Sequence, residues 1–369
     1  MGKWPKRWRT EQGLALKKIP NPLTEDNARI ISLTPSFSKV FKKVVLEWLL
    51  EYISDKLDLS QYGGRKGTSI SHYIIDFITF ILYNQDLKEP LAVLAAMVDY
   101  KKAFNRQNHS ILITLLGDMG VPGWLLNIVV GFLVERELIL SYRGAKSGSK
   151  DMPGGGPQGT VLGMFLFIIL INSVGFQQED KTMGERITRA ANAHKVIKQM
   201  HAKYVDDLTV AEALNLKEVL IGEREEELIR PLNYHKRTEH KIKVNCSRVE
   251  DKLAEIEEHA RQNQMKINQK KTKLMLFNTA IKYDFEPHME VNGEKLEVVS
   301  SMKLLGVIVT DNLKWHENTT HITKKAFSRL WIIRRLKSMG ASKTTIIDIY
   351  YKQIRSVLEF ASASSKECV

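Results

Sequence analysis

The 369-residue chain carries 55 Lys and Arg against 42 Asp and Glu, a net charge of +13, and 43% of its residues are hydrophobic. This length allows two or three subdomains, and the charge points to a polyanionic partner, nucleic acid before an acidic membrane surface. Two cysteines, Cys246 and Cys368, exclude a disulfide framework and a four-cysteine zinc site, which favours a reducing compartment. No signal-peptide core is present, and the longest apolar run, 161–171, is far below the ~20 residues that span a bilayer.

The first part of the chain predicts an arm followed by a helix. Residues 1–30 are basic and aromatic, with prolines, and are interpreted as an irregular basic arm. Thr34 as N-cap and Pro35 at the first position then begin a helix. Its apolar residues recur at helical spacing, at Phe37, Val40, Phe41, Val44, Val45, Trp48, Leu49 and Tyr52.

The lysines of this helix, Lys39, Lys42 and Lys43, lie off the apolar face. They form either a solvated stripe or a binding surface, and the pattern leaves both open.

The next elements lead to a first acidic residue. After a Gly-rich basic turn at 61–71, the apolar run 91–98 ends at Asp99, as a buried strand does when it delivers an acid at its carboxyl end. Helices are predicted at 111–119 and 124–134, and a strand at 138–142. A glycine-rich loop, 152–159, then precedes a buried helix at 161–171.

A second acidic feature follows a polar excursion at 177–203. Short β-favouring stretches flank Asp206 and Asp207, which predicts a strand-turn-strand with both acids at its tip. Further strands are expected within 265–278 and 296–310. Two amphipathic helices, 322–339 and 344–360, end the chain.

Adjacent carboxylates repel, and a bound divalent cation is the usual remedy in a closed site. If the strands that end at Asp99 and Asp206 are neighbours, these acids could hold two cations ~3.5–4 Å apart, as in two-metal phosphoryl transfer. Oxygen ligands select Mg²⁺ or Mn²⁺. The alternative is a solvated surface turn.

Two other residues carry chemistry near these acids. Phe104, five residues after Asp99, could lie over a nucleotide sugar and clash with a 2′-hydroxyl, or could be a core aromatic. The Gln158 amide can donate and accept hydrogen bonds at once, and the glycines before it allow a ligand to approach the backbone.

Taken together, these motifs resemble the reverse transcriptase domain of non-LTR (LINE-like) retrotransposons. The matching stretches, in the family's order, are 29–34 (RIISLT) with 38–40 (SKV), 61–67 (QYGGRKG), 99–104 (DYKKAF), 156–163 (GPQGTVLG), 204–207 (YVDD), Asn268 with Lys271 and Thr272, and 303–307 (KLLGV).

The resemblance implies an α+β right-hand polymerase with a palm built on an antiparallel sheet. The expected division is a basic arm at 1–30, fingers at 31–98, a palm at 99–310 and a truncated helical thumb at 311–369. Within the palm we expect finger insertions at about 115–150 and a polar insertion at about 177–203.

By the same resemblance, the chain makes DNA on an RNA template by extending a DNA primer with deoxynucleoside triphosphates. Asp99, Asp206 and Asp207 would be the catalytic residues that hold two Mg²⁺ ions, with Mn²⁺ as a substitute, and Lys271 would donate a proton to pyrophosphate. The expected nucleotide contacts are Tyr100, Phe104, Gln158, Arg29, Lys39 and Arg65.

The sequence also departs from the family pattern, for example at Gly64, where an aromatic is usual, and at Asn105, where Asp is frequent. A catalytically decayed, nucleic-acid-binding remnant is therefore the alternative. The full element is expected to carry an endonuclease that this chain lacks. With no membrane segment, we expect an intracellular protein of the cytoplasm and nucleus.

Overall fold

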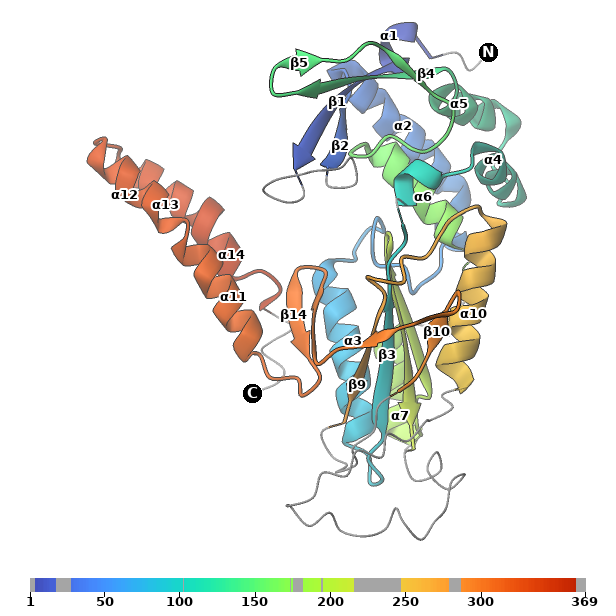
Figure 1. Ribbon diagram of the computed structural model, residues 1–369, viewed down its shortest axis with the longest axis vertical. Coiled ribbons are helices and arrows are strands. Elements are labelled where there is room, and N and C mark those ends of the chain that lie inside the picture. Colours follow the sequence, from blue (N-terminus) through green and yellow to red (C-terminus); the bar gives the residue numbers. More distant parts are fainter. Residues whose placement is uncertain are drawn as a thin grey trace.

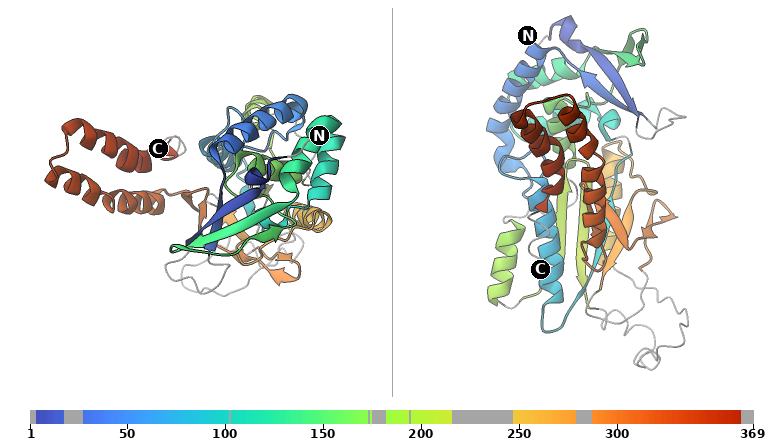
Figure 2. Two further views of the ribbon diagram at one scale, coloured as in Figure 1. Left: turned by 90° about the horizontal axis from the view of Figure 1, so that it is seen from above. Right: turned by 90° about the vertical axis from the view of Figure 1, so that its left-hand side faces the viewer.

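The computed structural model describes residues 4–17, 28–101, 103–172, 174, 182–193, 195–215, 247–278 and 287–362. In these ranges two groups of elements are stacked along the long axis, and the C-terminal helices stand off to one side (Figures 1 and 2). Helices and mainly antiparallel sheet are mixed, as the predicted α+β class requires.

A five-stranded sheet in the order β12-β9-β3-β8-β7 forms the lower group (Figure 1). The strands are β3 (Ala92–Val98), β7 (Gln199–Tyr204), β8 (Asp207–Leu214), β9 (Lys273–Phe277) and β12 (Glu297–Val298). β3 pairs antiparallel with both β8 and β9, and β8 pairs antiparallel with β7.

Helices cover both faces of this sheet, which explains why every residue of β3 is buried. Side chains alternate along a strand, so Val93, Ala95 and Met97 pack in the cluster that holds α3 (Ile70–Gln85). The alternate residues of β3 pack in the cluster that holds α10 (Ser247–Gln262). The apolar run at 91–98 is therefore the buried strand that was predicted.

Two predicted boundaries cut through the sheet. β3, expected at the end of the finger segment 31–98, is its central strand, and β7 lies inside the predicted polar insertion. The helix α7 (Met183–Ala193) is also in that insertion and packs against α3. Much of the range 177–203 is therefore part of the sheet layer.

The upper group is built on a second sheet, β2-β1-β4-β5, with β6 also paired to β4. Its strands are β1 (Thr10–Lys17), β2 (Ala28–Leu33), β4 (Arg136–Tyr142), β5 (Ala145–Lys146) and β6 (Lys150–Met152). β1 lies between β2 and β4, antiparallel to the first and parallel to the second.

The interpretation of residues 1–30 as an irregular arm is therefore wrong for the residues that the structure describes. After a short helix α1 (Lys6–Arg9), the chain enters β1. Trp4 is 4% exposed, and its Nε1 donates a hydrogen bond to the carbonyl oxygen of Ile128. Aromatic residues that we expect in an irregular arm instead anchor this end of the chain in the fold.

The buried face of the helix α2 (Ser36–Ile53) differs from the apolar face that the sequence predicts. Its inward residues are Ser38, Lys42, Val45, Leu49 and Ile53, whereas Phe37 is 82% and Val40 62% exposed. No side chain caps its start, and the Thr34 hydroxyl is buried without a hydrogen-bond partner.

The remaining helices follow the predictions with one exception. α4 (His109–Asp118), α5 (Gly123–Leu133) and α6 (Val161–Asn172) lie where expected. The predicted helix at 322–339 is instead two, α11 (His316–Phe327) and α12 (Leu330–Ser338), and α13 (Lys343–Tyr350), a π-helical turn (Tyr351–Arg355) and α14 (Ser356–Leu358) follow. None of the described helices is long and apolar enough to cross a membrane.

The β13 (Ser301–Leu304) and β14 (Val307–Thr310) hairpin joins the sheet layer to these C-terminal helices, and β10 (Glu290–Val291) and β11 (Glu294–Lys295) form a smaller hairpin.

Candidate active site

Three acids lie at one end of the two central strands. Asp99 follows β3 directly, and Asp207 begins β8. Since Val98 is paired with Leu208 in the antiparallel ladder, Asp99 and Asp207 lie next to each other at the same end of the two strands. Asp206 occupies the tight turn between β7 and β8, as predicted. The structure thus brings together residues that are more than a hundred positions apart.

The electrostatics of Asp207 reflect this convergence. Burial, and then the negative charges of Asp206 and Asp99, raise its pKa to about 6, while the positive charge of Lys271 opposes the shift. Neighbouring carboxylates disfavour the ionised form of this carboxyl group, and a bound cation would stabilise that ionised form.

The turn that leads into β9 surrounds Asp99 with polar groups. Asn268 Nδ2 donates to Asp99 Oδ2 at 3.0 Å, and Lys271 Nζ lies 3.7 Å from the same oxygen. The Asn268 backbone N–H donates to the Asp99 carbonyl at 2.7 Å, and the Asp99 N–H donates to Thr272 Oγ1 at 3.3 Å. These contacts hold the acid at the end of its strand.

The donor chemistry at this edge fits a hard divalent cation, because every candidate ligand is a carboxylate oxygen. Across the described ranges, however, no three Asp, Glu, His or Cys side chains are grouped as a ready-made metal site. Mg²⁺ is commonly held by one or two carboxylates together with water and substrate phosphate oxygens. The predicted ligands therefore fit a site that nucleotide and water complete.

A cavity of about 360 Å³ opens beside the acids, between the start of β9 and the β13–β14 hairpin. Asp99 and Asp207 line it on one side, and Lys270, Lys271 and Lys303 contribute positive charge. An acidic patch next to a basic cavity can hold a cation and a phosphate-bearing chain side by side.

Phe104 and the Gln158 loop lie close to each other. Phe104 is in the 3₁₀ turn Ala103–Arg106, and its carbonyl accepts a hydrogen bond from the Gly156 N–H at 2.7 Å. Its half-buried ring packs on Phe167, with the ring centroids 5.2 Å apart. The Gln158 carbonyl accepts from the Ser32 N–H at 3.0 Å, which ties the loop to β2.

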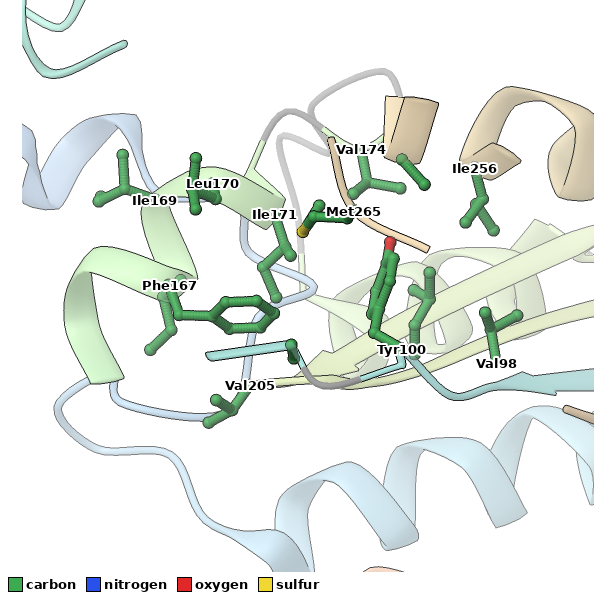
Figure 3. Close-up of a cluster of buried hydrophobic side chains, with 14 of the residues drawn as sticks. Val98, Tyr100, Phe167, Ile169, Leu170, Ile171, Val174, Val205, Ile256 and Met265 are labelled. Carbon is green, nitrogen blue, oxygen red and sulfur yellow. The ribbon is translucent and has the colours of Figure 1, made fainter. Parts of the chain in front are cut away.

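Tyr100 is not where a nucleotide contact should be. Its ring is 5% exposed and faces Phe167, with Met265 and Val174 nearby in the buried cluster of Figure 3. Burial raises the pKa of its hydroxyl. The predicted nucleotide contact by Tyr100 is therefore wrong for its side chain, which packs in the core next to the strand that carries Asp99.

The three basic residues predicted to contact nucleotide lie on elements other than those that carry the acids. Arg65 Nη1 donates to the Leu59 carbonyl at 2.9 Å, so it serves the protein's own backbone. Lys39 is exposed on α2. Arg29 lies in β2, paired with Leu16, and its side chain is outside the described residues.

Sequence reasoning missed the segment that supports the acid turn. Gln61 Oε1 accepts from the Val205 N–H at 3.1 Å, and Lys203 Nζ lies 2.8 Å from Asp58 Oδ2 in a buried ion pair. Gln61 lies in the stretch 61–67 that resembles the family, but the sequence of this stretch does not predict what the Gln61 side chain contacts. Asp58 and Lys203 are far apart in the sequence, so no local pattern predicts their pairing.

The chain matches known proteins over most of its length. Residues 17–309 match the family described as "Reverse transcriptase (RNA-dependent DNA polymerase)". The "Probable RNA-directed DNA polymerase from transposon BS" of Drosophila melanogaster is 23% identical over 91% of this chain and 34% of that protein. The "RNA-directed DNA polymerase from mobile element jockey" of Drosophila funebris is 25% identical over 86% of this chain and 30% of that protein.

A telomerase structure from Candida tropicalis in complex with a telomeric RNA fragment aligns with TM-score 0.49 at 10% identity, over 99% of this chain and 55% of that chain.

The α+β fold, with three acids brought together at the ends of its central strands, fits the class of protein that the sequence predicts. The chain belongs to the reverse transcriptase (RNA-dependent DNA polymerase) family. The predicted family and the predicted α+β class are thereby confirmed. The chain spans about a third or less of the length of the relatives named above.

Proposed function

We propose that this chain extends a DNA primer on an RNA template with deoxynucleoside triphosphates, as the polymerase segment of a non-LTR retrotransposon. The observation that carries the proposal is the convergence of Asp99, Asp206 and Asp207 at one edge of the central sheet in a chain of this family. Such a protein would act in the cytoplasm and nucleus, where its RNA and its DNA target are found.

Asp99 and Asp206 would hold the divalent cations, with Asp207 supporting them. Bound Mg²⁺ would activate the primer hydroxyl and stabilise the charge of the departing pyrophosphate. Asn268 keeps Asp99 in place through its hydrogen bond. Lys271, whose side chain is 70% exposed and near Asp99, can reach a leaving phosphate and give it a proton.

The primer end would lie in the cavity beside the acids, where Lys270 and Lys303 meet its phosphates. Further along, α11 and α12 expose basic residues for the template-primer duplex, namely Lys324, Lys325, Arg334, Arg335 and Lys337.

Phe104 and Gln158 would select and place the nucleotide. The half-exposed Phe104 ring can contact the sugar, where an added 2′-hydroxyl would clash. The Gln158 side chain lies on the loop that Phe104 itself holds through Gly156. The residue that would select the sugar and the residue that would position the nucleotide are thus joined through the Phe104–Gly156 hydrogen bond.

Primer extension on an RNA template with deoxynucleotides and Mg²⁺ tests the proposal. Asp206→Ala should abolish product, whereas Asp118→Ala, an exposed acid on α4, should leave it unchanged. Template-primer binding is measured in parallel by fluorescence anisotropy. Binding without extension, in Mg²⁺ and in Mn²⁺, would show a decayed remnant rather than a polymerase.

A further inference from the structure

Residues 58–63 run beside the acid turn. They lie in the loop between the 3₁₀ turn Ser54–Lys56 and α3. The Lys203 N–H donates to the Ser60 carbonyl and the Tyr62 N–H donates to the Lys203 carbonyl, both at 2.8 Å. A parallel bridge therefore joins Gln61 to Lys203 at the end of β7, the outermost strand of its sheet.

The Gln61 side chain continues this support into the turn itself. It is fully buried, and its Oε1 accepts hydrogen bonds from the N–H groups of Gly63 (2.9 Å) and Val205 (3.1 Å). Val205 has φ of 58°, a left-handed conformation that costs a β-branched residue free energy. Gln61 thus holds a strained residue directly before Asp206.

Gly63 permits this close approach. A Cβ atom at Gly63 would lie 2.7 Å from Val205 Cγ2 and 2.8 Å from the Val205 nitrogen. Any larger residue would push the segment away from the turn.

The other end of the segment is tied to α6. Lys203 Nζ, paired with Asp58, also donates to the carbonyl oxygens of Ile171 (3.2 Å) and Asn172 (3.1 Å). The Asp58 N–H donates to Asn172 Oδ1 at 2.8 Å. Because α6 begins just after the Gln158 loop, the helix and these contacts connect the Gln158 loop to the turn between β7 and β8 that carries Asp206.

From these contacts we infer that Gln61 is a positioning residue: its side-chain oxygen fixes the Val205 backbone and thereby sets the place of Asp206 for cation binding. The inference rests on the proposed function, because it assigns a support to the same site. Losing the Gln61 acceptor should loosen the turn and weaken cation binding more than it affects the rest of the fold.

The test compares Gln61→Met, which keeps the side chain's length but removes the acceptor, with Asn84→Leu, which removes a buried amide at the far end of α3. Hydrogen exchange of the Val205 amide and binding of Mn²⁺ alone, followed by electron paramagnetic resonance, are measured on the full chain. For Gln61→Met we expect roughly tenfold faster exchange and roughly tenfold weaker Mn²⁺ binding, the value of about one hydrogen bond. Asn84→Leu should change neither.

A second variant covers the case in which Gln61→Met does not fold. Gly63→Ala should displace the segment and weaken Mn²⁺ binding in the same way, whereas Gly184→Ala, where a Cβ meets nothing within 4 Å, should not.

The outcomes separate the two proposals. If the wild-type chain binds Mn²⁺ and extends primers, but both variants keep its Val205 exchange and Mn²⁺ affinity, the role of Gln61 is overturned and the proposed function stands. If the wild-type chain neither binds Mn²⁺ nor extends primers, both fall.

Discussion

The side-chain amide of Asn268 donates a hydrogen bond to the carboxylate of Asp99, with Nδ2 3.0 Å from Oδ2. Hydrogen bonds to a metal-binding carboxylate orient it, and their loss commonly costs about 10- to 100-fold in metal affinity. We therefore expect Asn268→Ala to raise the Mg²⁺ concentration for half-maximal primer extension by roughly tenfold or more. Asn263→Ala, at a buried amide bonded to His259 on α10, should leave this midpoint unchanged. Equal midpoints for the two variants would contradict the orienting role.

Breaking the buried pair of Lys203 and Asp58 should destabilise the fold. Both side chains are 5% exposed or less, so Lys203→Met leaves a buried carboxylate without its partner. The expected loss in the free energy of unfolding is about 3–5 kcal/mol, measured by urea denaturation. Lys252→Met, which breaks a more exposed pair with Glu255, should cost less than about 1 kcal/mol. Adding Asp58→Asn to Lys203→Met should recover part of the loss, and no recovery would argue against the pair as the cause.

Lys42 should make stability depend on alkaline pH. Burial, with the nearby Arg136 and Lys39, lowers its pKa from 10.5 to about 8, although Glu11 opposes the shift. Between these values the unfolded chain holds a proton that the folded chain has lost, so the wild-type free energy of unfolding rises with pH from about 8 to 10.5.

Relative to the wild type, Lys42→Met should therefore gain stability as pH falls from 10.5 to 8, by up to about 3 kcal/mol, and keep that gain below pH 8. Urea denaturation at pH 7 and pH 9.5 measures the difference, with Lys43→Met, at an exposed neighbour, as control. A difference between Lys42→Met and wild type that is the same at both pH values would refute the assignment.

Phe104 should control the choice of sugar. Replacing its half-buried ring by a methyl group opens space where a 2′-hydroxyl would lie, so Phe104→Ala should raise the kcat/KM for ribonucleotides relative to deoxynucleotides on the order of 10- to 100-fold. Phe327→Ala, at an exposed aromatic of α11, serves as the control. If the ratio is unchanged in Phe104→Ala, the ring is a core residue packed on Phe167 and no more.

The parts of the site that the sequence predicts are those with a strong local pattern. Eight consecutive apolar residues before Asp99 predict a strand covered on both faces, and the paired acids Asp206 and Asp207 predict a turn between two short strands. The sequence predicts helices α4 to α6 for the same reason, because each is a long apolar stretch with Gly or Pro at its boundaries.

What the sequence could not show depends on partners far along the chain. Lys42 and Lys203 look like surface charges, but the fold buries both of them, beside Glu11 and Asp58 respectively, which are distant in the sequence. Tyr100 shows a different difficulty. Successive side chains of an extended segment point to opposite sides, so Tyr100 lies in the core although it directly follows Asp99.

The position of β1 has a consequence for shortened forms of this protein. β1 hydrogen-bonds to β2 on one side and to β4 on the other. A chain that lacks residues 1–17 would lose β1, which leaves β2 and β4 with open edges and a gap one strand wide between them. Unpaired edges of this kind recruit strands from other molecules, so we expect such a shortened chain to aggregate even though it retains Asp99, Asp206 and Asp207.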